Sequence, residues 1–124
     1  MNFEQTLKAM IEAASGAAKG KWRKLRAFAE AEFRTLAAAA QQLEAGFLKD
    51  LAAAAALSTG KKRAAAVKKA KLRTTIGFEN LKLAAEGVLI TGEADVKLAA
   101  QDAINAATGV LREAVNASVG LAVL

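Results

Sequence analysis

Large apolar residues and alanines recur every three or four positions through most of the chain, which is the spacing of one face of an α-helix. The longest stripe of this kind lies in residues 21–57 and consists of Trp22, Leu25, Ala29, Phe33, Leu36, Ala40, Leu43, Phe47, Leu51, Ala54 and Leu57. Because no proline interrupts this stripe, we expect one helix about 55 Å long at about 1.5 Å per residue. Its packing partners must then be long as well.

Capping residues and glycines divide the rest of the chain into further helices. Asn2 is a favourable N-cap for a short first helix, and Gly16 and Gly20 predict a break or kink after it. Ser58-Thr59-Gly60 predicts a first hairpin turn, and Thr91-Gly92 predicts a second. The expected elements are a short helix at about 3–15 and long helices at about 21–57, 61–90 and 93–123.

The helix expected at 61–90 carries two apolar rows rather than one. The first row includes Phe78, and the second consists of Leu72, Ile76, Leu83 and Ile90. A face of this width predicts contact with two neighbouring helices. Glycines inside the helical patterns, such as Gly77, each cost about 1 kcal/mol relative to alanine, so we expect either close helix approach or a local kink at these positions.

Composition narrows the fold class. Hydrophobic residues make up 54% of the 124 residues, but 33 of them are alanine, which favours helix formation more than burial. The absence of proline and of β-branched runs excludes a β fold. We therefore predict an all-α protein with a single domain over residues 1–124: an elongated antiparallel three-helix bundle of long helices plus a short N-terminal helix.

Positive charge is concentrated in the first part of the chain. Residues 1–73 carry fifteen lysines and arginines against six acidic residues, whereas residues 74–124 carry three against six. No acidic residue occurs between Leu51 and Phe78. The candidate polyanion-binding residues in that run are Lys61, Lys62, Arg63, Lys68, Lys69, Lys71 and Arg73. Such a cluster indicates either an anionic partner or a solvated helix face.

A slender, alanine-rich bundle leaves apolar atoms uncovered, which favours an oligomer over a monomer. The candidate interface residues are Trp22, Leu72, Ile76, Leu83, Val115, Val119 and Leu121. Trp22 lies among basic residues, so stacking on nucleic-acid bases is a second interpretation of this side chain.

The sequence singles out no catalytic residue, no metal ligand and no cofactor-binding residue. Histidine and cysteine are absent, and although Ser58 and Lys61 match the S-x-x-K motif, its supporting motifs are missing, so a capped turn is the preferred interpretation. No uncharged apolar run is long enough to predict a transmembrane span.

We therefore expect a non-enzymatic helical structural or interaction protein that self-associates within a larger assembly, such as a virion or a secretion-type complex. Its expected partners are further copies of itself or other protein subunits. Two alternatives stay open: binding of nucleic acid or another polyanion through residues 61–73, and binding to an anionic membrane surface. The expected location is the cytoplasm or a particle assembled inside the cell.

Overall fold

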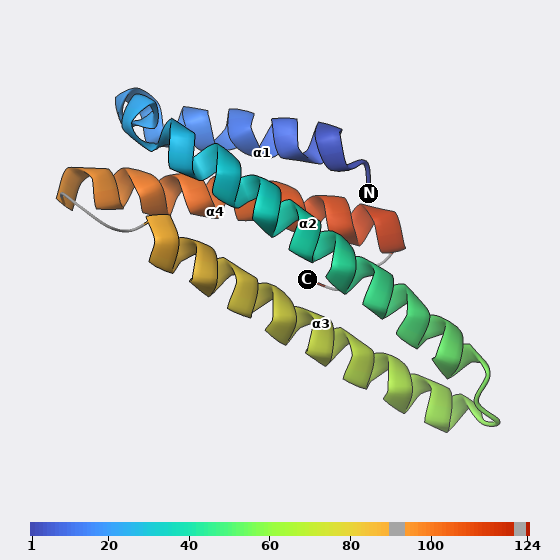
Figure 1. Ribbon diagram of the computed structural model, residues 1–124. Helices are drawn as coiled ribbons and strands as arrows, with labels where there is room; N and C mark the ends of the chain where they lie inside the picture. Colours follow the sequence, from blue (N-terminus) through green and yellow to red (C-terminus); the bar gives the residue numbers. More distant parts are fainter. Residues whose placement is uncertain (90–93, 121–123) are drawn as a thin grey trace.

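The computed structural model describes residues 1–89, 94–120 and 124, and these residues form an all-α bundle without strands. The helices are α1 (Phe3–Ala18), α2 (Trp22–Ala55), α3 (Gly60–Leu89) and α4 (Ala94–Val119). Successive helices run antiparallel (Figure 1). The predicted fold class is thus confirmed, and the short N-terminal helix packs on the bundle against both α4 and α2.

Local sequence signals explain where the first helices begin and end. The Asn2 side chain accepts a hydrogen bond from the Gln5 backbone N–H at 3.0 Å, which satisfies a free donor at the start of α1. The predicted break after this helix is present: α1 ends at Ala18, and a 3-10 turn, η1 (Lys19–Lys21), leads into α2. Lys19 rather than a glycine takes positive φ there, at 53°.

The turn between α2 and α3 lies where the sequence predicts it. The Thr59 hydroxyl accepts a hydrogen bond from the Lys62 backbone N–H at 3.1 Å, so Thr59 is the side chain that caps α3. Arg63 completes the turn by donating to the Leu57 carbonyl oxygen at 2.8 Å. The second predicted turn, Thr91-Gly92, lies outside the described residues.

The main core lies where all four helices overlap. Phe33, Phe78, Ile104 and Leu111 are fully buried in it, and many of the remaining positions are alanines. A second, smaller cluster, formed by Phe47 and Ala70 with Val119 packed against them, marks the end of the covered part of the bundle.

Beyond Phe47 and Ala70, α2 and α3 continue as a two-helix hairpin that no other described helix covers (Figure 1). We call this segment, residues 48–69, the arm. Within it only Ala54 is buried. The arm therefore depends on alanine contacts between its own two helices.

Close helix approach accounts for one of the glycines inside the helices. An ideal Cβ on Gly77 would lie 2.8 Å from Leu43 Cδ2 on α2, so α2 and α3 meet closely at this level. A Cβ on Gly46 or Gly109 would meet nothing within 4 Å. At those two positions the first of the two alternatives, close helix approach, is wrong, since no neighbouring side chain requires a glycine.

These two environments predict different results for alanine substitutions. Gly46→Ala should raise the free energy of unfolding by up to about 1 kcal/mol, because it removes backbone entropy from the unfolded chain and adds a methyl group in open space. Gly77→Ala should gain clearly less, or lose stability, because Leu43 must move. Urea denaturation followed by circular dichroism measures both, and equal gains at the two sites would contradict the close approach.

Candidate interaction surfaces

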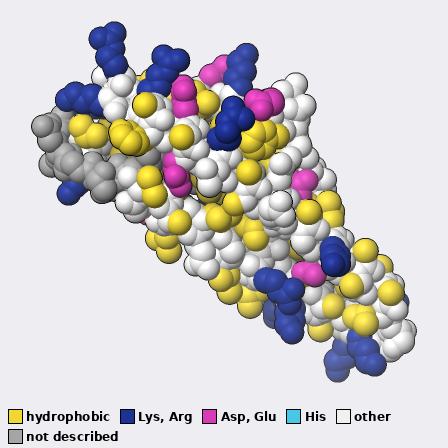
Figure 2. All heavy atoms as spheres, viewed as in Figure 1, with side chains coloured by type: hydrophobic (Ala, Val, Ile, Leu, Met, Phe, Trp, Pro, Cys, Tyr) yellow, Lys and Arg dark blue, Asp and Glu magenta, His cyan; other side chains and the backbone are white. Residues whose placement is uncertain are grey.

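The basic residues predicted to bind polyanions lie on the first half of α3, mostly on the arm. Six of the seven side chains are exposed and Lys71 is half-buried. Figure 2 shows lysine and arginine side chains gathered at the projecting end of the molecule, with apolar atoms between them. The fold therefore presents this charge at a protruding tip.

Few acidic groups neutralise this charge. Asp50 on α2 forms an ion pair with Arg73, with Arg73 Nη1 3.4 Å from Asp50 Oδ2, and the Arg73 side chain is exposed whereas that of Asp50 is half-buried. Arg63 is engaged with the Leu57 carbonyl oxygen. The other five cations form no ion pair with any residue that the structure describes. The unpaired charge should raise the local concentration of anions.

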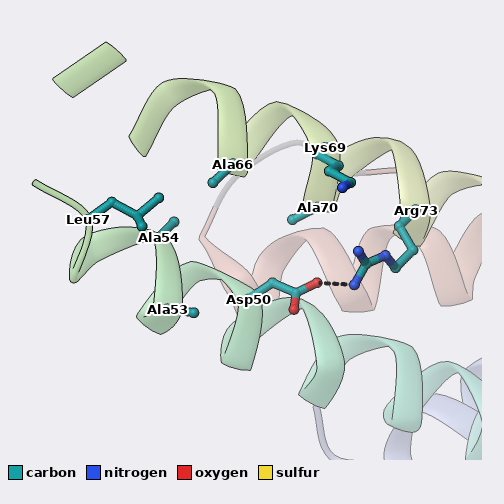
Figure 3. Close-up of a pocket in the computed structure, with 8 residues that line it drawn as sticks. All are labelled: Asp50, Ala53, Ala54, Leu57, Ala66, Lys69, Ala70 and Arg73. Carbon is teal, nitrogen blue, oxygen red and sulfur yellow. Dashed lines mark hydrogen bonds and ion pairs between the residues drawn. The ribbon is translucent and has the colours of Figure 1, made fainter. Parts of the chain in front are cut away.

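A shallow hollow of about 210 Å³ lies between the two helices of the arm. Figure 3 shows Asp50 and Arg73 pointing toward one another from α2 and α3, with Lys69 beside them. The rest of the lining is alanine and Leu57. This hollow offers apolar contact and one neutralised ion pair, which suits a docked side chain better than a chemical reaction.

The described part of the second apolar row on α3 is exposed, whereas Ile90 lies outside the described residues. Leu72, Ile76 and Leu83 are 61%, 52% and 62% exposed. The predicted contact of this helix with two neighbours is confirmed, because α3 packs against both α2 and α4. It makes these contacts through the other side, where Phe78 and Ala85 are buried, and not through Leu72, Ile76 and Leu83. We call the exposed side, which begins at Lys69 and ends at Glu86, the outer face of α3.

The other predicted interface residues lie elsewhere. Val115 is 1% exposed and belongs to the main core, so it is not available to a partner and its prediction as an interface residue is wrong. Val119 packs on the Phe47 cluster, and Trp22 stacks against Phe33 with ring centroids 6.5 Å apart. Leu121 lies outside the described residues. Of the predicted interface residues that the structure describes, only Leu72, Ile76 and Leu83 share one exposed surface.

Sequence reasoning missed a polar cluster centred on the buried side chain of Glu44. Its Oε1 atom accepts hydrogen bonds from the Ser118 hydroxyl at 2.7 Å and from the Met1 amino group at 3.2 Å, and its Oε2 atom is buried without a partner among the described residues. The signal was present, because Glu44 lies four residues after Ala40 and three before Phe47 on the buried stripe. This cluster joins the start of α1, the middle of α2 and the end of α4.

Five further large apolar residues are exposed in the described part of the chain, and three of them, Leu48, Leu57 and Val88, are 43%, 37% and 52% exposed. Phe28 on α2 and Leu98 on α4 are each 72% exposed. Neither belongs to the outer face of α3.

No protein-family model matches the chain, and neither a curated protein nor a solved structure shows significant similarity to it. Among the described residues, no group of three acidic, histidine or cysteine side chains is placed to hold a metal ion. Within the same ranges, none of the helices combines the length and the apolarity that crossing a bilayer requires.

Proposed function

We propose that this chain is a non-enzymatic helical interaction protein that self-associates within a larger assembly through the outer face of α3. The observation that carries this proposal is the exposure of Leu72, Ile76 and Leu83 in one row, on a helix whose opposite side is buried. Large apolar side chains that line up on a surface indicate an interaction site, whereas isolated ones do not.

The energetics favour a partner on this face. Removing the rest of a half-exposed leucine or isoleucine from water gains on the order of 1 kcal/mol, and a symmetric dimer gains it from both copies. The helix is already ordered by its packing on α2 and α4, so association requires little additional ordering of the backbone. A small interface of this kind fits reversible association.

Leu83→Asp should abolish this association and leave helicity unchanged, because a carboxylate on the outer face would lose its water on pairing but keep it in the monomer, where Leu83 is 62% exposed. The matched control is Leu98→Asp, which places the same charge at a leucine with at least the same exposure on α4. Sedimentation velocity over a range of protein concentrations measures the mass, and circular dichroism measures the helicity.

A monomer at every concentration up to hundreds of micromolar would contradict self-association. Dissociation by Leu98→Asp but not by Leu83→Asp would place the interface on α4 instead.

A second candidate function is nucleic-acid binding through the arm. The specific observation is that five cations on the first half of α3 have no acidic partner among the described residues, and that the arm carries most of them beyond the rest of the bundle. Because the basic tip projects, its lysines can contact the phosphate groups of a nucleic acid without a clash between the nucleic acid and the four-helix part of the protein. An anionic membrane surface is the alternative target for the same charges.

Replacing Lys61, Lys62 and Lys68 together by glutamate should weaken binding to a DNA oligonucleotide, and the binding of the unmodified protein should fall steeply with salt. The control replaces Arg23, Lys24 and Lys97 by glutamate, which changes the net charge equally on exposed positions elsewhere. Fluorescence anisotropy measures both sets. Equal losses in both would contradict a site on the arm, and binding to anionic vesicles without binding to DNA would favour the membrane surface.

A further inference from the structure

The outer face of α3 carries charges of opposite sign at its two ends. Along this face the side chains recur at steps of three and four residues, which is the spacing of the contact positions in a coiled coil. They are Lys69, Leu72, Ile76, Glu79, Leu83 and Glu86. The basic end lies toward the arm and the acidic end toward the main core.

These positions are symmetric about one point on the helix. Leu72 and Leu83 lie equally far on either side of the midpoint between Gly77 and Phe78, and so do Lys69 and Glu86. We propose that two copies of the chain pair through this face with their α3 helices antiparallel, about a two-fold axis at that midpoint. This inference rests on the proposed self-association and specifies its geometry.

In this register every contact is made twice. Leu72 packs against the partner's Leu83, and Lys69 lies opposite the partner's Glu86. Ile76 packs against the aliphatic part of the partner's Glu79. A parallel pair would instead place Lys69 against the partner's Lys69 and Glu86 against the partner's Glu86, which is repulsive. The order of charges along the face therefore selects the antiparallel arrangement.

The shape of the surface supports the same register. Lys69, Leu72, Arg73 and Ile76 surround a shallow depression of about 280 Å³. These positions are related as i, i+3, i+4 and i+7, which is the set of four residues that receives one side chain of a facing helix in knobs-into-holes packing. In the proposed register, the residue level with the centre of this depression is the partner's Leu83.

Lys69 and Glu86 are placed so that they can form the proposed ion pairs between the two copies. Glu86 Oε1 accepts a hydrogen bond from the Gln101 amide at 3.1 Å, which holds the carboxylate at the edge of the face and leaves its other oxygen for an incoming cation. Lys69 is exposed and forms no ion pair with a described residue. Arg73 lies at the edge of the outer face of α3. In the proposed register it comes near the partner's Asn80, which is uncharged, so Arg73 meets no like charge there.

The pairing fixes the shape of the dimer. Each α3 begins at Gly60, and the two ends point in opposite directions from the axis, so the two tips would lie about 50 Å apart at about 1.5 Å per residue. The dimer is thus a rod with a basic tip at each end.

Cysteine pairing tests the register, because the chain contains no cysteine of its own. Lys69→Cys and Glu86→Cys are prepared separately and oxidised by air, alone and as an equal mixture. A disulfide-linked dimer should form mainly in the mixture, since only there do two thiols lie opposite one another. A linked dimer from Lys69→Cys alone, at a yield equal to that of the mixture, would overturn the antiparallel register.

Charge reversal supplies a second readout that needs no disulfide. Lys69→Glu and Glu86→Lys should each raise the dimer dissociation constant by about tenfold, since two attractive pairs become repulsive, and the double variant should return it close to the original value. Losses that add in the double variant would overturn the pairing. If the unmodified protein dimerises but both tests give the contradicting result, only the proposed register is wrong. An unmodified protein that stays monomeric contradicts self-association itself.

Discussion

The unequal lengths of the helices determine the rest of the structure. α2 and α3 contain 34 and 30 residues, whereas α1 and α4 contain 16 and 26. The two shorter helices can cover the longer pair only as far as Phe47 and Ala70, where Val119 closes the covered region. Beyond that level, the described part of the chain contains a hairpin of two helices instead of a bundle of four. The projecting arm, with its exposed basic residues, follows directly from this mismatch.

The many alanines also affect which side chains stay exposed along the sides of the bundle. Fully buried alanines such as Ala29, Ala40 and Ala103 let the helices pack closely, but they contribute little apolar area each. Only one side of α3 faces this thin core, and Phe78 is the largest buried side chain on that side. Leu72, Ile76 and Leu83 on α3 therefore stay in water unless another chain covers them, which is why we place the interaction surface on these residues.

The sequence predicts the local features well and the tertiary ones poorly. The caps at Asn2 and Thr59 depend on neighbouring residues alone, and both are present. Which of two apolar rows becomes core depends instead on helix lengths and rotations set by the whole fold. Val115 and Leu72 belong to similar stripes in the sequence, yet one is buried and the other is exposed. The packing of α1 on α4, and the use of Glu44 in a buried cluster, also depend on contacts between distant segments.

The most direct test of the outer face of α3 as the interaction surface is a dilution series of the unmodified, isotope-labelled protein followed by amide chemical shifts. If two copies associate through this face, shifts and line widths change with concentration for the residues between Lys69 and Glu86, while those of α1 stay constant. Changes centred on Phe28 or Leu98 instead, or spectra that are the same at every concentration, would contradict it.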